Sequence, residues 1–312
     1  MAQMILATLA QDHVLISTRS ELDAVLGRST DGDSNTFSWV GLVPTMGALH
    51  DGHAALIREA ADYRDYNSNV HDMRGAVVVS IFVNPAQFSP DEDFEAYPRD
   101  VESDIKIATD AGADYVFIPE VNDVYPCYPT VTAGTEQDAQ PGSVAARWEG
   151  ESRPHHFAGV TTVVKRLFDI VQPNCAFFGE KDYQQVRVIE EMVANLGLPV
   201  EIWRVGTVRD LSGLALSSRN QYLNDKDLQA AHSISQALQA VQNAVHSDEE
   251  PDVEKLLKIA RKRLDDRIQL DYLAIVDDHS LEPLQRLDAN ADARIIFAGR
   301  IGTTRLIDNF SI

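Results

Sequence analysis

The 312-residue sequence has little cysteine and little basic charge, and each shortage excludes a class of protein. Its two cysteines, Cys127 and Cys175, form no CxxC pair and show no metal-ligand spacing, which fits a reducing cytoplasm. Lys and Arg number 27 against 48 Asp and Glu, a net charge of −21. A chain this acidic is not a general nucleic-acid or membrane-surface binder, because it would repel phosphate groups.

Long hydrophobic runs are also missing. No run reaches the roughly 18 apolar residues of a membrane-spanning helix. Residues 1–13 lack the basic segment and the apolar core of a signal peptide, so the sequence predicts a cytoplasmic protein. Because the charge is so negative, any phosphate ligand must be held by a local set of lysines, arginines and backbone N–H groups. Most of the acidity is interpreted as a solubilising surface.

The first two-thirds of the chain alternates between predicted strands and helices. Polar residues 28–38 and 65–75 are predicted as surface loops, and Ser20 and Gly27 as the ends of a short helix. Strands are predicted at 4–9, 39–43, 76–83, 115–118, 175–178 and 200–205, and helices at 20–26, 51–64, 100–111, 160–171 and 183–196. This alternation predicts an α/β fold with a mainly parallel, Rossmann-like sheet in a domain spanning 1–206.

After Gly206 the pattern changes to a polar turn followed by two helices and two strands. The helices are predicted at 225–246 and 252–265, and the strands at 270–276 and 294–298. The sequence therefore predicts a second, smaller α+β domain spanning 207–312.

The stretch Trp39–Ala60, WVGLVPTMGALHDGHAALIREA, is the most informative local pattern. An apolar strand is followed by Pro44, which is predicted to end the strand because proline has no N–H to donate. A small-residue turn then leads to His50 and His53 at the start of a helix. Residues three apart face the same side of a helical turn, and a helix N-terminus attracts anions. The stretch predicts a nucleotide phosphate site that needs no metal to explain it.

Four polar clusters follow predicted strands, where α/β enzymes place their sites: 45–53, 84–88, 179–185 and 216–220. Each alone has a plainer interpretation. A histidine at a helix start is more often a cap, Asn-Pro is more often a turn, and Lys-Asp after glycine is usually a solvated helix start. Ser-Ser-Arg-Asn is commonly a cap. Their occurrence together favours a binding site.

Six motifs in this order resemble the pantothenate synthetase (pantoate–β-alanine ligase) family. They are PTMGALHDGH at 44–53, SIFVNPAQF at 80–88, RPHHFAGVTTVV at 153–164, FFGEKDYQQ at 177–185, GLALSSRNQYL at 213–223 and GTTRLIDN at 302–309. HDGH also resembles the HIGH-type signature of a wider nucleotidyltransferase group that includes class I aminoacyl-tRNA synthetases. The resemblance implies that ATP activates pantoate as pantoyl adenylate with release of diphosphate. The amine of β-alanine then displaces AMP to give pantothenate.

The resemblance also implies roles for individual residues. His53 is the expected proton donor, and His50, Lys181, Ser217, Ser218 and Arg219 are the other expected catalytic residues. Gln87 is expected to bind pantoate close to β-alanine, Gln185 to bind pantoate, and Arg153 and His156 to border the site. The expected ATP contacts are Met46, Gly47, Ala48, Leu49, His50, Asp51, Gly52, His53, Gly179, Glu180, Lys181, Asp182, Val208, Leu216, Ser217, Ser218 and Arg219.

Further expectations concern partners and assembly. Mg²⁺ is expected to accompany the phosphates with few protein ligands of its own, and no metal ligand is assigned. The second domain is expected to close as a lid that excludes water, and the protein is expected to be a homodimer. Ser212 replaces an aspartate usual in the family, which is expected to loosen the lid's hinge. Leu216 replaces a methionine of similar volume, and HDGH replaces the commoner HEGH; neither is expected to matter.

Two other interpretations are weaker. One is a different nucleotidyltransferase of the same fold, such as a cytidylyl- or adenylyltransferase. Such an enzyme would act on phosphate substrates and would be expected to have basic residues where this chain has the neutral Gln87 and Gln185. A module that senses ATP without turnover does not explain why all six motifs occur together.

Overall fold

The computed structural model describes residues 14–28, 37–88, 94, 97–128, 133, 139–246, 252–288 and 291–312. Their contacts form two compact units. The first comprises the chain up to Gly179 together with Val188–Val205, and the second comprises Glu180–Arg187 with Gly206–Ile312. The Glu180–Arg187 segment therefore groups with the second unit, although the sequence-based division places it in the first domain.

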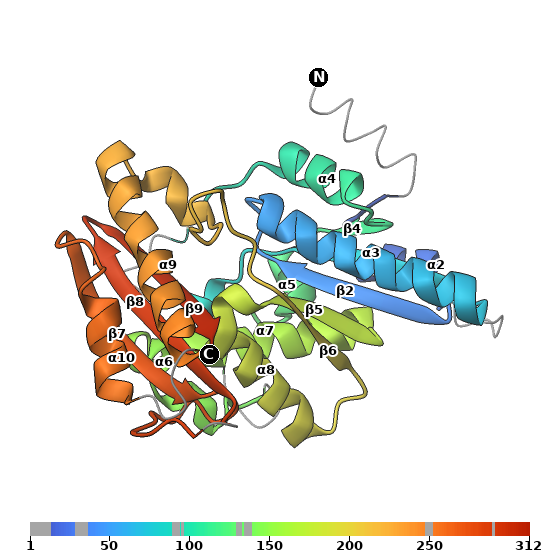
Figure 1. Ribbon diagram of the computed structural model, residues 1–312. Helices are drawn as coiled ribbons and strands as arrows, with labels where there is room; N and C mark the ends of the chain where they lie inside the picture. Colours follow the sequence, from blue (N-terminus) through green and yellow to red (C-terminus); the bar gives the residue numbers. More distant parts are fainter. Residues whose placement is uncertain are drawn as a thin grey trace. The chain divides into compact units, whose positions relative to one another are not determined.

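The first unit contains a six-stranded parallel sheet with the order β1-β4-β3-β2-β5-β6, of which β4, β2, β5 and β6 are labelled in Figure 1. The parallel sheet is as the sequence predicts, but the strand order and β1 were not predicted. The strands are β1 (Leu15–Ile16), β2 (Trp39–Thr45), β3 (Gly75–Ile81), β4 (Tyr115–Phe117), β5 (Cys175–Gly179) and β6 (Glu201–Val205). The connecting helices are α2 (Arg19–Val25), α3 (Asp51–His71), α4 (Val101–Asp110), α5 (Val121–Val124), α6 (Glu149–Ser152), α7 (His156–Val171) and α8 (Tyr183–Leu196).

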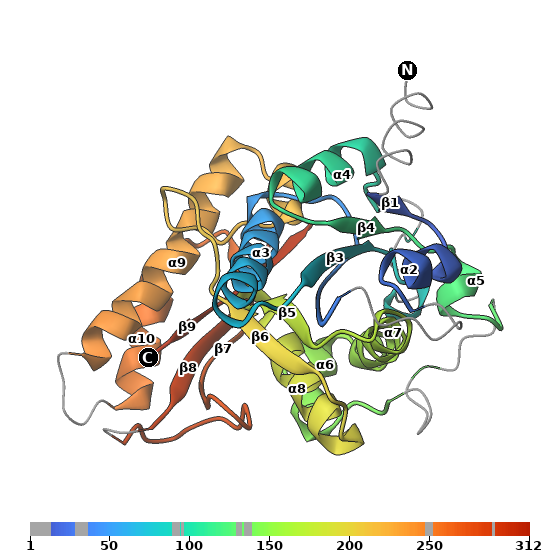
Figure 2. The same cartoon turned by 90° about the vertical axis from the view of Figure 1, so that its right-hand side faces the viewer.

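Helices α3 and α4 cover one face of this sheet, and α7 lies on the opposite face (Figure 2). The strands are rich in apolar residues because both faces are buried. Val77 and Val79 of β3 pack with Ile57 of α3 and Ile105 of α4, and none of these side chains is exposed. Because helices cover both faces, the polar turns that follow the strands lie at the carboxyl-terminal edge of the sheet.

Pro44 does not end β2, contrary to the prediction, since it pairs with Ser80 of β3. Alternate residues of a central parallel strand bond to opposite neighbours. Val40 O accepts from Asn174 N on the β5 side, and Thr45 O accepts from Phe82 N on the β3 side. The backbone nitrogen of Pro44 therefore points to the β5 side, where the pairing of β2 with β5 has already stopped at Leu42. Its missing N–H breaks no ladder bond.

Several predicted boundaries also change. Thr18, not Ser20, caps α2, through a reciprocal contact with Glu21. Helix α3 continues past Arg64 to His71 and ends at Asp72 in the left-handed conformation, so the polar residues predicted as a loop lie on a helix. Helix α7 starts at His156, four residues before the predicted start at residue 160. The strand predicted at 4–9, and most of the loop 28–38, lie outside the described residues.

The second unit is an antiparallel sheet of three strands, β7 (Ile268–Asp277), β8 (Ala293–Ile301) and β9 (Thr304–Ser311). Helices α9 (Asp225–Val245) and α10 (Val253–Arg261) pack on it, with Leu238, Leu257 and Phe297 in the shared core. The smaller α+β fold is as predicted, but β9 was not predicted as a strand. No helix in the described ranges is long and apolar enough to cross a lipid bilayer.

The two cysteines are expected to react very differently with thiol reagents. Cys127 is exposed, whereas Cys175 is buried. Burial, with the Glu201 carboxylate second, raises the pKa of the Cys175 thiol to about 12. A thiol titration should therefore find one reactive group in the native protein and two in denaturant. Because the pKa of this thiol is higher in the folded than in the unfolded state, the free energy of unfolding should decrease between about pH 9 and pH 12. The decrease should be smaller in Cys175→Ala.

Candidate active site

The strand order places a topological switch point between β2 and β5. From β2 the chain proceeds to β3 and β4 on one side, and later to β5 and β6 on the other. Ligands of open α/β sheets bind beyond the carboxyl ends of the strands at such a point. The segment after β2 begins at Met46, and β5 ends at Gly179. Two of the clusters predicted from sequence therefore begin at the switch point.

The turn after β2 has an unusual backbone. Gly47 and Ala48 both have positive φ angles, 82° and 51°. Thr45 stabilises the turn, since its Oγ1 donates to Ser80 O over 2.8 Å and accepts from Gly47 N over 3.3 Å. A left-handed conformation is strained for alanine, so tertiary contacts must hold this turn.

Asp104 of α4 supplies that contact. Its carboxylate accepts from Ala48 N over 2.9 Å and from Leu49 N over 2.7 Å, and the residue is 2% exposed. A Cβ on Gly47 would lie 2.8 Å from Asp104 Oδ2, which explains the glycine. The N–H groups of Ala48 and Leu49 are therefore already bonded, so any contact of these two predicted ATP ligands with nucleotide must use other atoms.

His50 and His53 form the N-terminus of α3. His50 Nδ1 accepts from Gly52 N over 3.1 Å, and His53 Nδ1 accepts from His50 N over 3.3 Å. The ring centroids are 4.2 Å apart, as their spacing predicts for side chains on one side of the helix. Because each Nδ1 accepts a hydrogen bond, each neutral ring carries its proton on Nε2. The pair thus presents N–H donors at a helix start that also favours anions.

Gln87 is held in the short helix η1 (Pro85–Gln87) after β3. Its Nε2 lies 2.7 Å from Met46 Sδ, and its Oε1 accepts from Asn84 Nδ2 over 3.1 Å. Asn84 is in turn fixed by Gly159 O and by the hydroxyl of Tyr125. The structure therefore brings Gln87 against the turn after β2, with its carbonyl oxygen directed to Asn84 and its amide nitrogen to Met46.

In the second unit, one pocket gathers predicted phosphate ligands. Its lining includes Lys181, Ser217 and Arg219, together with Arg305, which sequence reasoning missed. Arg305 Nε donates to Asp271 over 2.7 Å. The three cationic side chains in the lining are suited to a polyphosphate, because they would neutralise its charge, although Asp308 also lines this pocket.

The remaining predicted residues occupy ordered positions. Leu216 N donates to Val208 O over 2.9 Å. Ser217 caps the short helix η4 (Ser218–Tyr222) by accepting from Arg219 N. In the turn before them, Asp210 accepts from both the backbone N and the hydroxyl of Ser212, so this replacement is itself part of the turn.

The other predicted substrate contacts lie on helices. Gln185 lies partly exposed on α8 and groups with the second unit, whereas Gln87 belongs to the first. Arg153 and His156 lie together at the start of α7, with Nη1 and Nε2 3.4 Å apart.

A model of the pantoate–β-alanine ligase family matches residues 14–311. The chain belongs to that family. It is 44% identical over 276 residues to the pantothenate synthetase of Rubrobacter xylanophilus, covering 88% of this chain and 91% of the relative. The crystal structure of pantothenate synthetase from Thermus thermophilus matches with a TM-score of 0.81 at 43% identity, covering 95% of this chain and 98% of that one. The ligase of Francisella tularensis, solved with βγ-ATP and β-alanine, matches with a TM-score of 0.68 at 32% identity, covering 96% and 97%.

In this ligase, the residues to which the sequence analysis gave no role contact other site residues. Asp104 positions the turn after β2, and Tyr125 positions Asn84, which binds Gln87 and lies in the predicted cluster 84–88. Asp104 did give a signal, because a carboxylate lies beside Ile105 and Ala108 on the buried side of its helix. Its partners, however, lie 55 and 56 residues away, so nothing local identified them.

Replacing Asp104 with asparagine is expected to lower kcat/KM for ATP about tenfold, or about 1.4 kcal/mol. One of the two backbone N–H groups would then face an NH₂ group, which displaces the turn. The effect on stability should be small. Burial raises the pKa of Asp104, with the N–H groups of Leu49 and Ala48 opposing, so removing the charge relieves desolvation while one hydrogen bond is lost.

The sign of that pKa shift gives a second test. The folded state binds this proton more readily than the unfolded state, so acidification should not reduce stability through Asp104. Activity should fall as the carboxyl is protonated, and the asparagine variant should lack this acid limb. Asp110→Asn, an exposed change on the same helix, is the control. Full activity of Asp104→Asn with a normal pH profile would contradict the assignment.

Proposed function

We propose that this ligase condenses (R)-pantoate with β-alanine, converting ATP to AMP and diphosphate through a pantoyl adenylate. The observation that carries the proposal is the contact between Gln87 and Met46 beside the histidine-capped start of α3. It places a neutral amide suited to a small hydroxy acid next to donors suited to phosphate. Family membership supports the reaction, as does the Francisella tularensis relative solved with βγ-ATP and β-alanine.

In the first step, a pantoate carboxylate oxygen attacks the α-phosphorus of ATP and diphosphate leaves. Both reactants are anionic, so the site must neutralise charge that grows on the phosphate oxygens. His50 and His53 supply Nε2–H donors for this purpose, and His53 acts as the proton donor. In the second unit, Lys181, Ser217 and Arg219 are the residues proposed to bind phosphate oxygens.

In the second step, the amine of β-alanine attacks the acyl carbon of pantoyl adenylate. The bond from that carbon to the phosphate oxygen breaks, AMP leaves, and the nitrogen loses a proton to solvent as the amide forms. Gln87 and Gln185 hold pantoate through amide groups, which add no charge. A cation bound to the carboxylate would weaken it as a nucleophile, so neutral ligands suit the first step. They also hold the acid in position for the second step.

Mg²⁺ is proposed to enter as its complex with ATP. Among the residues that the structure describes, no three His, Cys, Asp or Glu side chains are grouped to hold a metal ion. The proposed ion would be bound mostly through phosphate oxygens and water, as is usual for Mg²⁺. When bound, the ion shares in neutralising the phosphate charge.

The direct test is an assay with ATP, pantoate and β-alanine that follows both AMP and pantothenate. AMP and pantothenate should form in equal amounts, and neither should form without pantoate. Release of AMP only with a phosphate-bearing acceptor would favour a different nucleotidyltransferase. ATP binding without any AMP would favour the sensing module.

We also propose that the protein is a cytoplasmic homodimer, as its family resemblance implies. Light scattering of the purified protein should give twice the mass of the 312-residue chain. The role of residues 207–312 as a lid stays a prediction.

A further inference from the structure

Asn309 of β9 binds the backbone of the turn that carries Lys181. Its Nδ2 donates to Glu180 O over 2.8 Å and to Lys181 O over 3.0 Å. Its Oδ1 accepts from Arg294 Nη1 over 2.6 Å, and the residue is 5% exposed. Both amide protons and the carbonyl oxygen are therefore engaged, as a buried amide requires. The partners on the turn lie 129 and 128 residues away in sequence.

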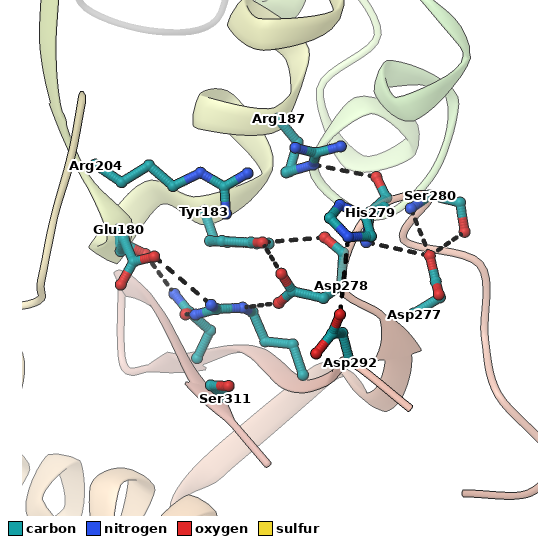
Figure 3. A network of polar contacts seen from close by, with 12 residues as sticks. Glu180, Tyr183, Arg187, Arg204, Asp277, Asp278, His279, Ser280, Asp292 and Ser311 are labelled. Carbon is teal, nitrogen blue, oxygen red and sulfur yellow. Dashed lines mark hydrogen bonds and ion pairs between the residues drawn. The ribbon is translucent and has the colours of Figure 1, made fainter. Parts of the chain in front are cut away.

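A partly buried network fixes Asn309 itself, and in Figure 3 the Tyr183 hydroxyl points to Asp278, with Glu180 nearby. Arg294 lies over the Tyr183 ring, with its guanidinium carbon 3.5 Å from the ring centroid. Its Nε donates to Asp278 over 2.8 Å, and the Tyr183 hydroxyl also donates to Asp278. All of these residues belong to the second unit. The network ties η3 (Glu180–Asp182) and the first turn of α8 to β8 and β9.

The neighbouring residue, Asp308, holds the other predicted ATP segment. It accepts from both Nη atoms of Arg209, over 2.7 and 2.8 Å. Arg209 also donates to Gly213 O, which fixes the turn that leads into Ser217. Successive side chains of a strand point to opposite faces. Asp308 and Asn309 of β9 thus bind two segments, the turn that carries Lys181 and the turn at 209–213 that precedes Ser217.

We propose that Asn309 is a positioning residue that sets the place of the Lys181 side chain in the pocket shared with Ser217 and Arg219. The inference rests on the proposed role of Lys181 as a phosphate ligand. A three-residue 3₁₀ turn has little stability of its own, so its position depends on its tertiary bonds. Asn309 acts through the turn and touches no substrate.

The test compares Asn309→Asp with Lys181→Met, alone and combined, in the complete protein. Aspartate has the same shape and keeps the contact with Arg294, but it replaces two donated hydrogen bonds with repulsion between oxygens. Asn309→Asp should lower kcat/KM for ATP about tenfold and leave the KM for pantoate unchanged. Lys181→Met alone should lower kcat/KM for ATP about 100-fold. In the Lys181→Met background, Asn309→Asp should add less than about a threefold loss. Asn243→Asp, an exposed change on α9, is the control.

Equal losses from Asn309→Asp in both backgrounds would show a general structural role and overturn the inference. An equal rise in the KM for pantoate would do the same. If Lys181→Met retains full activity with ATP, the proposed phosphate contact fails, and the inference fails with it. Melting curves check that each variant folds. If Asn309→Asp does not fold, Asn309→Ser, which keeps one donor, replaces it in the same cycle under the same criteria.

Discussion

Replacing His53 with asparagine is expected to lower kcat/KM for adenylate formation by about 100- to 1,000-fold without unfolding the protein. His53 has two separate functions in the structure. Its Nδ1 accepts from His50 N and caps α3, whereas its Nε2 carries the proton proposed to reach phosphate. Asparagine places an oxygen near the position of Nδ1, so it keeps the cap and removes the distal donor. Melting temperature and AMP formation measure the two functions separately.

His53→Gln is the complementary variant, because its longer side chain can place an amide N–H donor at the position of Nε2, and glutamine is a common residue at this position of a capping box. It should therefore retain more activity than His53→Asn. His71→Asn, an exposed change in the last turn of the same helix, is the control. If His53→Asn were as active as His53→Gln, or more active, the distal donor would not be what the reaction needs.

The sequence predicted the central sheet well because the evidence for it is local. Runs such as Ala76–Val83 are apolar and β-branched over a strand's length, and glycines mark the following turns. The failures were equally physical. Pro44 stays in its strand because the pairing on its unbonded side has already ended. Helix α3 passes through polar residues because only its apolar face, which includes Ile57, needs burial.

The candidate site divides in the same way. His50, His53, Gln87 and Lys181 were predicted because each follows a strand and belongs to a motif with its own chemistry. Asp104 and Asn309 were assigned no role, because their partners are backbone groups far away in sequence. Asn84 lies in the predicted cluster 84–88, but its bond to Gly159 O was not predicted. A buried side chain that bonds to a distant backbone leaves no periodic pattern. Only the folded chain shows what it positions.

Replacing Gln87 with glutamate is expected to raise the KM for pantoate about 100-fold and to change the KM for ATP little. In the structure, Asn84 binds the Gln87 carbonyl oxygen and Met46 Sδ lies against the amide nitrogen. The amide carries two N–H groups, and the second is the one proposed to bind the acid. Glutamate preserves the contact with Asn84 but presents a second carboxylate to the pantoate carboxylate. A lost charge-assisted hydrogen bond and like-charge repulsion together amount to about 2.7 kcal/mol, which is a factor of about 100.

Gln87→Met separates the two effects, because it removes the donor without adding charge. It should raise the KM for pantoate only about tenfold. Gly159→Ala provides an indirect test, since the added Cβ would lie 2.3 Å from Ala86 O and displace η1 with Gln87. It should therefore weaken pantoate binding with Gln87 intact, whereas Gln239→Glu on the exposed side of α9 should change nothing. An unaltered KM for pantoate in Gln87→Glu at neutral pH would remove the amide from the acid site, because two adjacent ionised carboxylates repel each other.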